Sequence, residues 1–278
     1  MKRRRLGLAT RAIHGDPKAR ADWTAVAPPL YQSSTFTNPI GSTAEVLYSR
    51  YGNNPNQVDI GRRLALLEGA EAALFVSSGM GATALAHLAV LRPGDHLISS
   101  EWIYGGVQRL FSQEFGRLGI DVSFVNPTQH RTWKKAMRKT TRAVFIETPT
   151  NPLLRIIDIE SVVALAHERG ALVVVDNTFA TPYLQQPLAL GADIVVHSTT
   201  KYLGGHSDLI GGFIATDDHT VAETMGPPLP SVGSGEPIDA AVEALERGPA
   251  VLVVDAGHPV GILTRSDLLD FLSQKGAR

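Results

Sequence analysis

Residues 171–176 read Ala-Leu-Val-Val-Val-Asp, an uninterrupted apolar run that ends in a carboxylate. A strand that is apolar at every position, rather than at every second one, is typical of a parallel sheet covered on both faces. Strands that alternate with helices predict an α/β fold with a mostly parallel sheet and right-handed crossovers. Runs of the same kind, with helical segments between most of them, lie at 72–76, 96–99, 122–125, 143–147 and 194–197.

The composition is that of an ordinary globular protein. Of 278 residues, 44% are hydrophobic and 19% are charged, and the formal net charge is −1. Disorder of the whole chain is therefore excluded, because it requires low hydrophobicity and high net charge. The absence of cysteine excludes disulfides, thiolate zinc sites and cysteine nucleophiles. No apolar run approaches the roughly 18 residues of a membrane helix, so we expect a soluble, cytoplasmic protein with no membrane partner.

The charge is unevenly distributed along the chain. Residues 1–215 carry 22 Lys and Arg against 17 Asp and Glu, a net +5, whereas residues 216–278 carry 4 against 10, a net −6. The basic excess is too dilute to indicate a nucleic-acid partner. The change of sign and a stretch rich in Pro and Gly near 216–235 indicate units of different kinds. The predicted parts are an N-terminal arm (1–60), a large domain (61–215), a linker (216–235) and a C-terminal motif (236–278).

Lys201 is the first candidate for a chemical role. It follows the apolar run 192–196, in the stretch 197–202 that reads His-Ser-Thr-Thr-Lys-Tyr. Ligands of open α/β sheets bind beyond the carboxyl ends of the strands, and partial desolvation there makes a lysine amine nucleophilic. Ser198 and Thr200 add hydroxyls suited to binding a phosphate. A surface lysine in a polar loop explains the same pattern equally well.

Asp176 is the second candidate, because it ends the apolar run that opens this section. A carboxylate at the end of a buried strand needs a partner to remain charged. A helix cap or an ion pair in the core would provide that partner. The protonated ring nitrogen of a cofactor would provide it as well.

Residues 77–81 (Ser-Ser-Gly-Met-Gly) lie between a predicted strand and a predicted helix. Small residues let backbone N–H groups approach an anion, and a helix N-terminus favours negative charge. The stretch matches neither the Walker pattern nor the dinucleotide fingerprint, so alone it is a weak indication of a phosphate site. Together with Asp176 and Lys201 it meets the needs of pyridoxal phosphate. The lysine forms the imine, the aspartate keeps the pyridine nitrogen protonated, and the loop holds the phosphate.

Further stretches extend this pattern in a fixed order. They are 48–53 (Tyr-Ser-Arg-Tyr-Gly-Asn), 67–70 (Leu-Glu-Gly-Ala) followed by 77–80, 147–152 (Glu-Thr-Pro-Thr-Asn-Pro), 175–178 (Val-Asp-Asn-Thr) and 197–202. With them, residues 10–215 closely resemble the cystathionine γ-synthase/γ-lyase family of trans-sulfuration enzymes, within the Cys/Met-metabolism group of pyridoxal-phosphate enzymes. The resemblance implies the type I fold of aspartate aminotransferase, with pyridoxal 5'-phosphate as cofactor and small amino acids as substrates.

The resemblance also implies roles for individual residues. Lys201 is then the Schiff-base lysine that also moves protons between substrate carbons, and Asp176 is the partner of the pyridinium. Tyr104 stacks on the cofactor ring and assists proton transfer; the alternative for it is a packed loop tyrosine. The other cofactor-binding residues implied are Ser78, Gly79, Met80, Asn151, Thr178, Ser198 and Thr200, with Gly79, Met80, Ser198 and Thr200 on the phosphate.

Tyr48 and Arg50 resemble residues that reach the phosphate of a neighbouring subunit. The complete site would then need at least a dimer, and enzymes of this kind are usually tetramers. We therefore expect a homo-oligomer. The stretch 53–56 (Asn-Asn-Pro-Asn) is longer than the usual Gly-Asn-Pro-Thr, which would shift the arm slightly.

The reaction expected from the resemblance is that of a cystathionine γ-synthase. Residues 202–208 (Tyr-Leu-Gly-Gly-His-Ser-Asp) resemble the synthase/γ-lyase branch more than the homoserine sulfhydrylases. A synthase replaces the γ-substituent of an activated homoserine ester with cysteine. The alternative is a cystathionine γ- or β-lyase, and all of these reactions begin with deprotonation of the α-carbon.

The end of the chain departs from this family. Its members carry a C-terminal domain that supplies an arginine for the substrate carboxylate, and nothing after Ala215 resembles it. Residues 225–272 instead resemble the second half of a CBS domain, in which Thr264 and Asp267 contact the ribose of an adenosine ligand; a helix N-terminus explains the pair equally well. We expect the C-terminal domain to be missing and replaced by a half CBS module. The alternative function is then a catalytically impaired, truncated fusion that binds the cofactor or an adenosine nucleotide.

Overall fold

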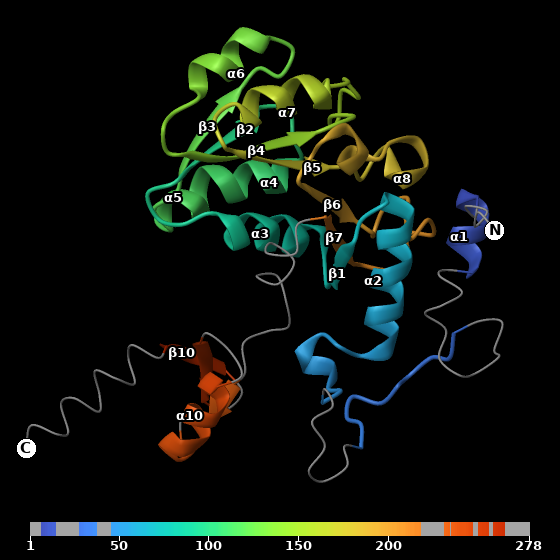
Figure 1. The fold of residues 1–278 in the computed structure, drawn as a ribbon, viewed down its shortest axis with the longest axis vertical. Coiled ribbons are helices and arrows are strands. Elements are labelled where there is room, and N and C mark those ends of the chain that lie inside the picture. Colours follow the sequence, from blue (N-terminus) through green and yellow to red (C-terminus); the bar gives the residue numbers. More distant parts are fainter. Residues whose placement is uncertain are drawn as a thin grey trace, which may run out of the picture. The chain divides into compact units, whose positions relative to one another are not determined.

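The computed structural model describes residues 7–14, 28–37, 46–217, 231–233, 235–246, 250–255 and 258–264 (Figure 1). The chain divides into two compact units. The first comprises residues 1–47 and 53–226, and the second comprises residues 48–52 and 227–278. Within the described ranges, no helix combines the length and the apolar character needed to cross a membrane.

A seven-stranded sheet forms the centre of the first unit, in the order β1-β7-β6-β5-β4-β2-β3. Its strands are β1 (Ala72–Val76), β2 (His96–Ser100), β3 (Asp121–Val125), β4 (Thr141–Glu147), β5 (Leu172–Asp176), β6 (Ile194–Ser198) and β7 (Gly212–Thr216). The pairs β2–β3, β2–β4, β4–β5 and β5–β6 are parallel, whereas β7 pairs antiparallel with both β1 and β6. The prediction of a mostly parallel sheet is confirmed, and β7 is an addition to the predicted pattern.

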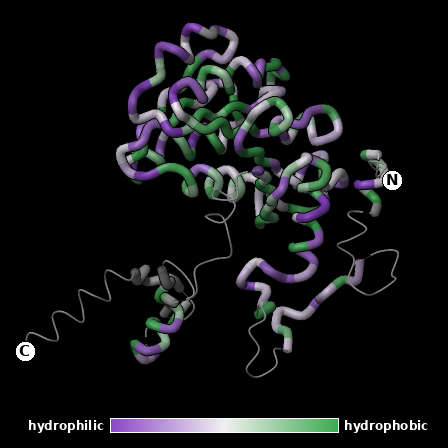
Figure 2. Tube along the Cα trace, viewed as in Figure 1, coloured by the Kyte–Doolittle hydropathy of each residue, from purple (hydrophilic) through white to green (hydrophobic). Residues whose placement is uncertain are grey.

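Helices cover both faces of this sheet, as the uninterrupted apolar strands predict. One face carries α3 (Gly79–Val90), α4 (Gly105–Arg109) and α5 (Phe115–Arg117), and the other carries α6 (His130–Ala136) and α7 (Ile159–His167) (Figure 1). Strand β5 shows the division, because Val174 packs in the cluster with α3 whereas Val173 and Val175 pack in the cluster with α7. Each such buried side chain stabilises the fold by about 1.5–3 kcal/mol. Figure 2 shows the hydrophobic residues gathered along the strands between these layers.

Helix α2 (Pro55–Glu68) precedes β1. It begins at Pro55, because the Asn54 side chain accepts a hydrogen bond from the Asn56 N–H and Pro55 suits the first helical turn. It ends at Gly69, whose φ of 79° is a conformation that glycine adopts without strain. The remaining α-helices described in the first unit are α1 (Leu8–His14) and α8 (Thr181–Leu184).

In its described residues, the second unit contains a three-stranded sheet and the α-helix α10. Its elements are β8 (Ser231–Gly233), α10 (Ile238–Glu246), β9 (Ala250–Asp255) and β10 (His258–Thr264). Strand β9 pairs parallel with β8 and antiparallel with β10. Val232 packs against Ala241, Ala244 and Leu245 of α10 in a small apolar cluster. The part of the predicted C-terminal motif that follows Thr264 lies outside the described residues.

His87 of α3 makes the stability of the first unit depend on pH. The side chain is fully buried and its ring lies 4.9–6.0 Å from the rings of Phe111, Phe115 and Phe145. Burial lowers the pKa of His87 from 6.5 to about 4. Because the folded pKa lies below the unfolded one, the unfolded state binds the proton first, and stability is lost as the pH falls from about 6.5 towards 4.

We expect this histidine to remove about 2 kcal/mol from the free energy of unfolding between about pH 7 and pH 5. The variant His87→Leu should lose that part of the pH dependence in urea unfolding at the two pH values. Burial also lowers the pKa of His96 to about 4, but His96 is present in both proteins and its effect cancels in the comparison. The exposed His206 provides the control variant, His206→Leu. An unchanged pH dependence in His87→Leu would contradict this assignment.

Candidate active site

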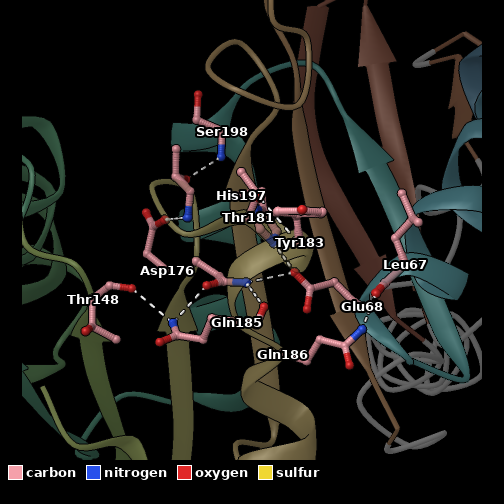
Figure 3. A network of polar contacts seen from close by, with 12 residues as sticks. Leu67, Glu68, Thr148, Asp176, Thr181, Tyr183, Gln185, Gln186, His197 and Ser198 are labelled. Atoms are coloured by element: carbon pink, nitrogen blue, oxygen red, sulfur yellow. Dashed lines mark hydrogen bonds and ion pairs between the residues drawn. The ribbon is translucent and has the colours of Figure 1, made fainter. Parts of the chain in front are cut away.

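The carboxyl ends of β5 and β6 bring three of the predicted site residues together. Asp176 ends β5 and Ser198 ends β6, and the register places Asp176 opposite Val196. The Thr178 N–H donates to Asp176 Oδ1 at 2.9 Å, and the Ser198 N–H donates to Thr178 Oγ1 at 2.8 Å. Asp176, Thr178 and Ser198 are therefore held in one hydrogen-bonded series, part of which is visible in Figure 3.

The environment of Asp176 favours a positively charged partner. Burial of the carboxyl group raises the pKa of Asp176, while hydrogen bonds from Thr178 and the charge of His197 act in the opposite direction. A poorly solvated carboxylate of this kind is stabilised by a cationic hydrogen-bond donor. The helix-cap alternative is not supported, because the Asp176 side chain accepts from Thr178 within a turn that precedes no helix until Thr181.

The loop between β1 and α3 approaches the end of β6 closely. Helix α3 begins at Gly79, and Ser78 Oγ accepts a hydrogen bond from the Gly81 N–H at 3.0 Å. A Cβ atom at Gly79 would lie 2.6 Å from the Cβ of Ser198, and one at Gly212 would lie 2.0 Å from the backbone oxygen of Ser78. Only glycine permits this approach, which places the positive end of the α3 dipole beside the Ser198 hydroxyl.

Lys201 lies in the turn that follows β6 and is exposed. It lines a pocket of about 360 Å³ together with Phe179, Thr200, Tyr202, Gly205 and Ser207. Thr200 Oγ1 accepts a hydrogen bond from the Gly211 N–H at 3.1 Å, which fixes its hydroxyl at the same edge of the sheet. The amine is thus accessible and stands three residues beyond Ser198 on the chain.

Tyr104 and Met80 lie beside each other. A Cβ atom built on Gly106 would meet Tyr104 Cε1 at 2.5 Å and Met80 Sδ at 3.2 Å, so Gly106 leaves room for both side chains. Tyr104 is 51% exposed. A ring that keeps this much free surface is available to stack on a ligand, which supports the predicted role over a tyrosine packed into the loop.

Glu147 was absent from the predicted set of site residues. It ends β4, is buried, and stands opposite Asp176 in the parallel register. Its Oε2 accepts from the Tyr104 N–H at 2.7 Å and its Oε1 accepts from the Asn151 N–H at 2.8 Å. Burial raises the pKa of Glu147 to about 8, with a further contribution from the negative charge of Asp176. The sequence pattern that identified Asp176 also applies to Glu147, because each of these acidic residues ends an apolar strand.

A second buried group missed at the sequence level lies behind the strand ends (Figure 3). Glu68 accepts a hydrogen bond from His197 Nε2, and both side chains are fully buried. Asn177 Nδ2 donates to Glu68 Oε1 at 3.0 Å. Each of the three residues lies within one of the sequence stretches that carry the resemblance, at 67–70, 175–178 and 197–202.

Four predicted residues are not placed in this site. Tyr48 and Arg50 belong to the second unit, where the Arg50 guanidinium lies 5.7 Å from the Tyr48 ring centre in a short 3₁₀ turn. Thr264 is the last residue of β10, also in the second unit. Asp267 lies outside the described residues.

The residues at this edge of the sheet fit pyridoxal phosphate. The N-terminus of α3 with the hydroxyls of Ser198 and Thr200 suits a phosphate, and the close approach at Gly79 keeps that space free of side chains. Asp176 is the half-buried carboxyl group that a ring N–H would meet. Tyr104 offers an exposed ring, and Lys201 offers the amine.

Comparison with known proteins agrees with this reading. Cystathionine gamma-lyase of Bacillus subtilis is 43% identical over 217 residues, 78% of this chain and 57% of that protein. Cystathionine gamma-synthase of Mycobacterium bovis is 45% identical over 219 residues, 78% of this chain and 56% of that protein. The crystal structure of metB from Corynebacterium glutamicum matches with a TM-score of 0.75 and 40% identity, covering 80% of this chain and 58% of that chain.

The chain spans less than two thirds of the length of these relatives. A model of the Cys/Met metabolism PLP-dependent enzymes matches residues 9–255, which is most of the chain and includes the start of the second unit. The half CBS module and the loss of the C-terminal domain are not shown by these matches. This chain belongs to the Cys/Met metabolism PLP-dependent enzyme family, whose cofactor is pyridoxal 5'-phosphate.

Proposed function

We propose that this chain binds pyridoxal phosphate at the carboxyl edge of its sheet and acts as a cystathionine γ-synthase-like enzyme. In this reaction cysteine replaces the γ-substituent of an activated homoserine ester. The observation that carries the proposal is the hydrogen-bonded series from Asp176 through Thr178 to Ser198, with the N-terminus of α3 packed against its end. When bound, the cofactor supplies an electron sink for negative charge at the substrate α-carbon.

The residues divide this work among themselves. Asp176 would hold a proton on the ring nitrogen, because a half-buried carboxylate that is poorly solvated is stabilised by a cationic N–H donor. Ser198, Thr200 and the N–H groups of the first turn of α3 bind the phosphate. Lys201 holds the cofactor covalently and, once released, moves a proton between substrate carbons.

Tyr104 and Asn151 complete the proposed site around the cofactor ring. Tyr104 would stack on the ring and assist proton transfer, and Asn151 would lie beside the ring. Both backbone N–H groups are held by the one carboxylate of Glu147. The two residues therefore keep a constant separation at the end of β4, which is what a rigid planar ligand requires.

The choice of reaction rests on residues 202–208, whose pattern favours the synthase/γ-lyase branch. The relatives do not separate the two activities, because a gamma-lyase and a gamma-synthase match at 43% and 45% identity. A cystathionine γ- or β-lyase is therefore the second candidate. Formation of cystathionine from an activated homoserine ester and cysteine would support the synthase. Release of cysteine or homocysteine from cystathionine would support a γ- or β-lyase respectively.

The visible absorption spectrum of the purified chain with added pyridoxal phosphate is the decisive test. A yellow band that is lost on borohydride reduction, with the cofactor then found covalently attached to Lys201 by peptide mass spectrometry, would establish the cofactor site. The turnover assays with homoserine esters and cystathionine follow on the same preparation. A protein that stays colourless and unmodified would refute the proposal and favour the alternative of an impaired protein.

Tyr48 and Arg50 extend the proposal to a homo-oligomer, a dimer or a tetramer, in which this pair binds the phosphate of a neighbouring subunit. We expect Tyr48→Ala to raise the cofactor Kd roughly tenfold, because one hydrogen bond to the phosphate is lost. Fluorescence titration of the cofactor measures this, with light scattering to establish the oligomer. Tyr31→Ala provides a matched control on the described part of the N-terminal arm. The same Kd for wild type and Tyr48→Ala in an established dimer would rule out this role.

For the second unit we propose a half CBS module that binds an adenosine compound with Thr264 and Asp267. The order β8-α10-β9-β10, with β8 and β9 parallel, supports it. Titration with adenosine nucleotides in a calorimeter tests the idea. The absence of both heat and thermal stabilisation would count against it.

A further inference from the structure

The cofactor residues stand on strand ends that share one buried polar network (Figure 3). Asn177 directly follows Asp176, His197 directly precedes Ser198, and Thr148 directly follows Glu147. Asn177 and His197 both donate to Glu68, in the last turn of α2. The network therefore joins the ends of β4, β5 and β6 to one carboxylate that lies outside the sheet.

Further contacts make the network continuous. Gln185 Nε2 donates to Asn177 Oδ1 at 2.9 Å and to the Thr148 oxygen at 3.1 Å. Asn177 Nδ2 also donates to the Gln185 oxygen at 2.9 Å. The position of the β5 end thus depends on contacts made from both of its neighbouring strands.

Because the Glu68–His197 pair is buried, its charges can affect the pKa of nearby groups. Both side chains are fully buried, and Glu68 Oε2 and His197 Nδ1 have no hydrogen-bond partner among the residues that the structure describes. Charges in such surroundings are weakly screened. Two ionisable groups on the neighbouring strands interact with Asp176, namely Glu147 on β4 and His197 on β6, and Glu68 on α2 contacts His197. The charge of His197 lowers the pKa of Asp176, whereas the charge of Asp176 raises the pKa of Glu147.

A purely structural ion pair could stand anywhere in the core, and burying one is costly. This pair stands beside the residues proposed to hold the ring nitrogen and the phosphate. We propose that Glu68 and His197 act together as positioning residues of the cofactor site, fixing the ends of β5 and β6 and keeping a positive charge beside Asp176. This inference rests on the proposed function.

The test compares Glu68→Gln, His197→Gln and the double variant with wild type, all as the full chain. We expect each single variant to raise the cofactor Kd about tenfold, and the double variant to raise it no further, because both residues act through one pair. His197→Gln should also move the pH midpoint of the visible band of the bound cofactor upwards, since a positive charge beside the site is removed. Glu71→Gln, an exposed glutamate close by on the chain, is the control.

The outcomes separate this inference from the proposed function. A wild-type chain that binds no cofactor refutes the proposed function whatever the variants do. If the wild type binds the cofactor but the Kd and the pH midpoint are unchanged in the folded variants, the positioning role alone is overturned. The positioning role is also overturned if the increases in Kd of the two single variants multiply in the double variant. If Glu68→Gln does not fold, His197→Gln decides by itself: an unchanged Kd and midpoint overturn the inference.

Discussion

Lys201→Ala is expected to retain no cofactor after borohydride reduction, whereas the wild-type chain retains it covalently. Lys201 follows the end of β6 and lines the pocket at that edge of the sheet, so its amine is the group placed to hold the cofactor. The same amine is proposed to move the substrate proton, and we expect turnover to fall about 10²- to 10⁴-fold. Absorption spectra before and after reduction, mass spectrometry and turnover assays measure these effects.

The exposed Lys135 of α6 provides the control for Lys201. Lys135→Ala removes an amine from the first unit without touching the proposed site, so the spectrum and turnover should match wild type. If Lys201→Ala kept the reducible band, or if the cofactor were found on another lysine, the assignment of Lys201 would be wrong. The surface-lysine interpretation would then hold.

Asp176→Asn is expected to leave the fold intact and to lower turnover by about 10²- to 10³-fold, the usual cost of losing one stabilising group aimed at developing charge. Asparagine has a similar shape but no negative charge, so it does not hold a proton on the ring nitrogen. Steady-state kinetics with the substrate that the wild type converts gives the comparison. We expect the larger part of the effect in kcat, since the charge matters most in the transition state.

The same substitution separates function from stability. Burial raises the pKa of Asp176, so the folded, cofactor-free protein carries a carboxylate that prefers to be neutral. Above the unfolded pKa this charge opposes folding. Asp176→Asn should therefore unfold in the absence of cofactor at a urea concentration equal to or above that of wild type.

Asp193→Asn, at the opposite end of the sheet, is the control for kinetics. Unchanged turnover in Asp176→Asn would remove Asp176 from the mechanism.

Local sequence patterns were sufficient for the parallel strands and for the main candidates of the site. The bounds of β1 agree with its apolar run, and those of β2, β3, β4, β5 and β6 differ from theirs by at most two residues at either end. The reason is that a strand buried on both faces is apolar at every position, which is visible without knowledge of its neighbours. Asp176, Ser198 and Lys201 follow from the same patterns, because polar residues directly after such strands meet at one edge.

Other features were decided by the tertiary structure alone. Strand β7 is added antiparallel between β1 and β6, where Gly212 packs against the backbone of Ser78. Nothing in its own residues specifies that position, since it depends on two strands that lie far away in the sequence. The hydrogen bonds of Glu147 and Glu68 likewise join residues up to 129 positions apart. Sequence patterns report local periodicity, whereas these contacts exist only once the strands have been ordered in the sheet. The chain's own residues therefore determined its strands and its proposed chemical groups, and tertiary packing decided which buried carboxylates hold those groups in place.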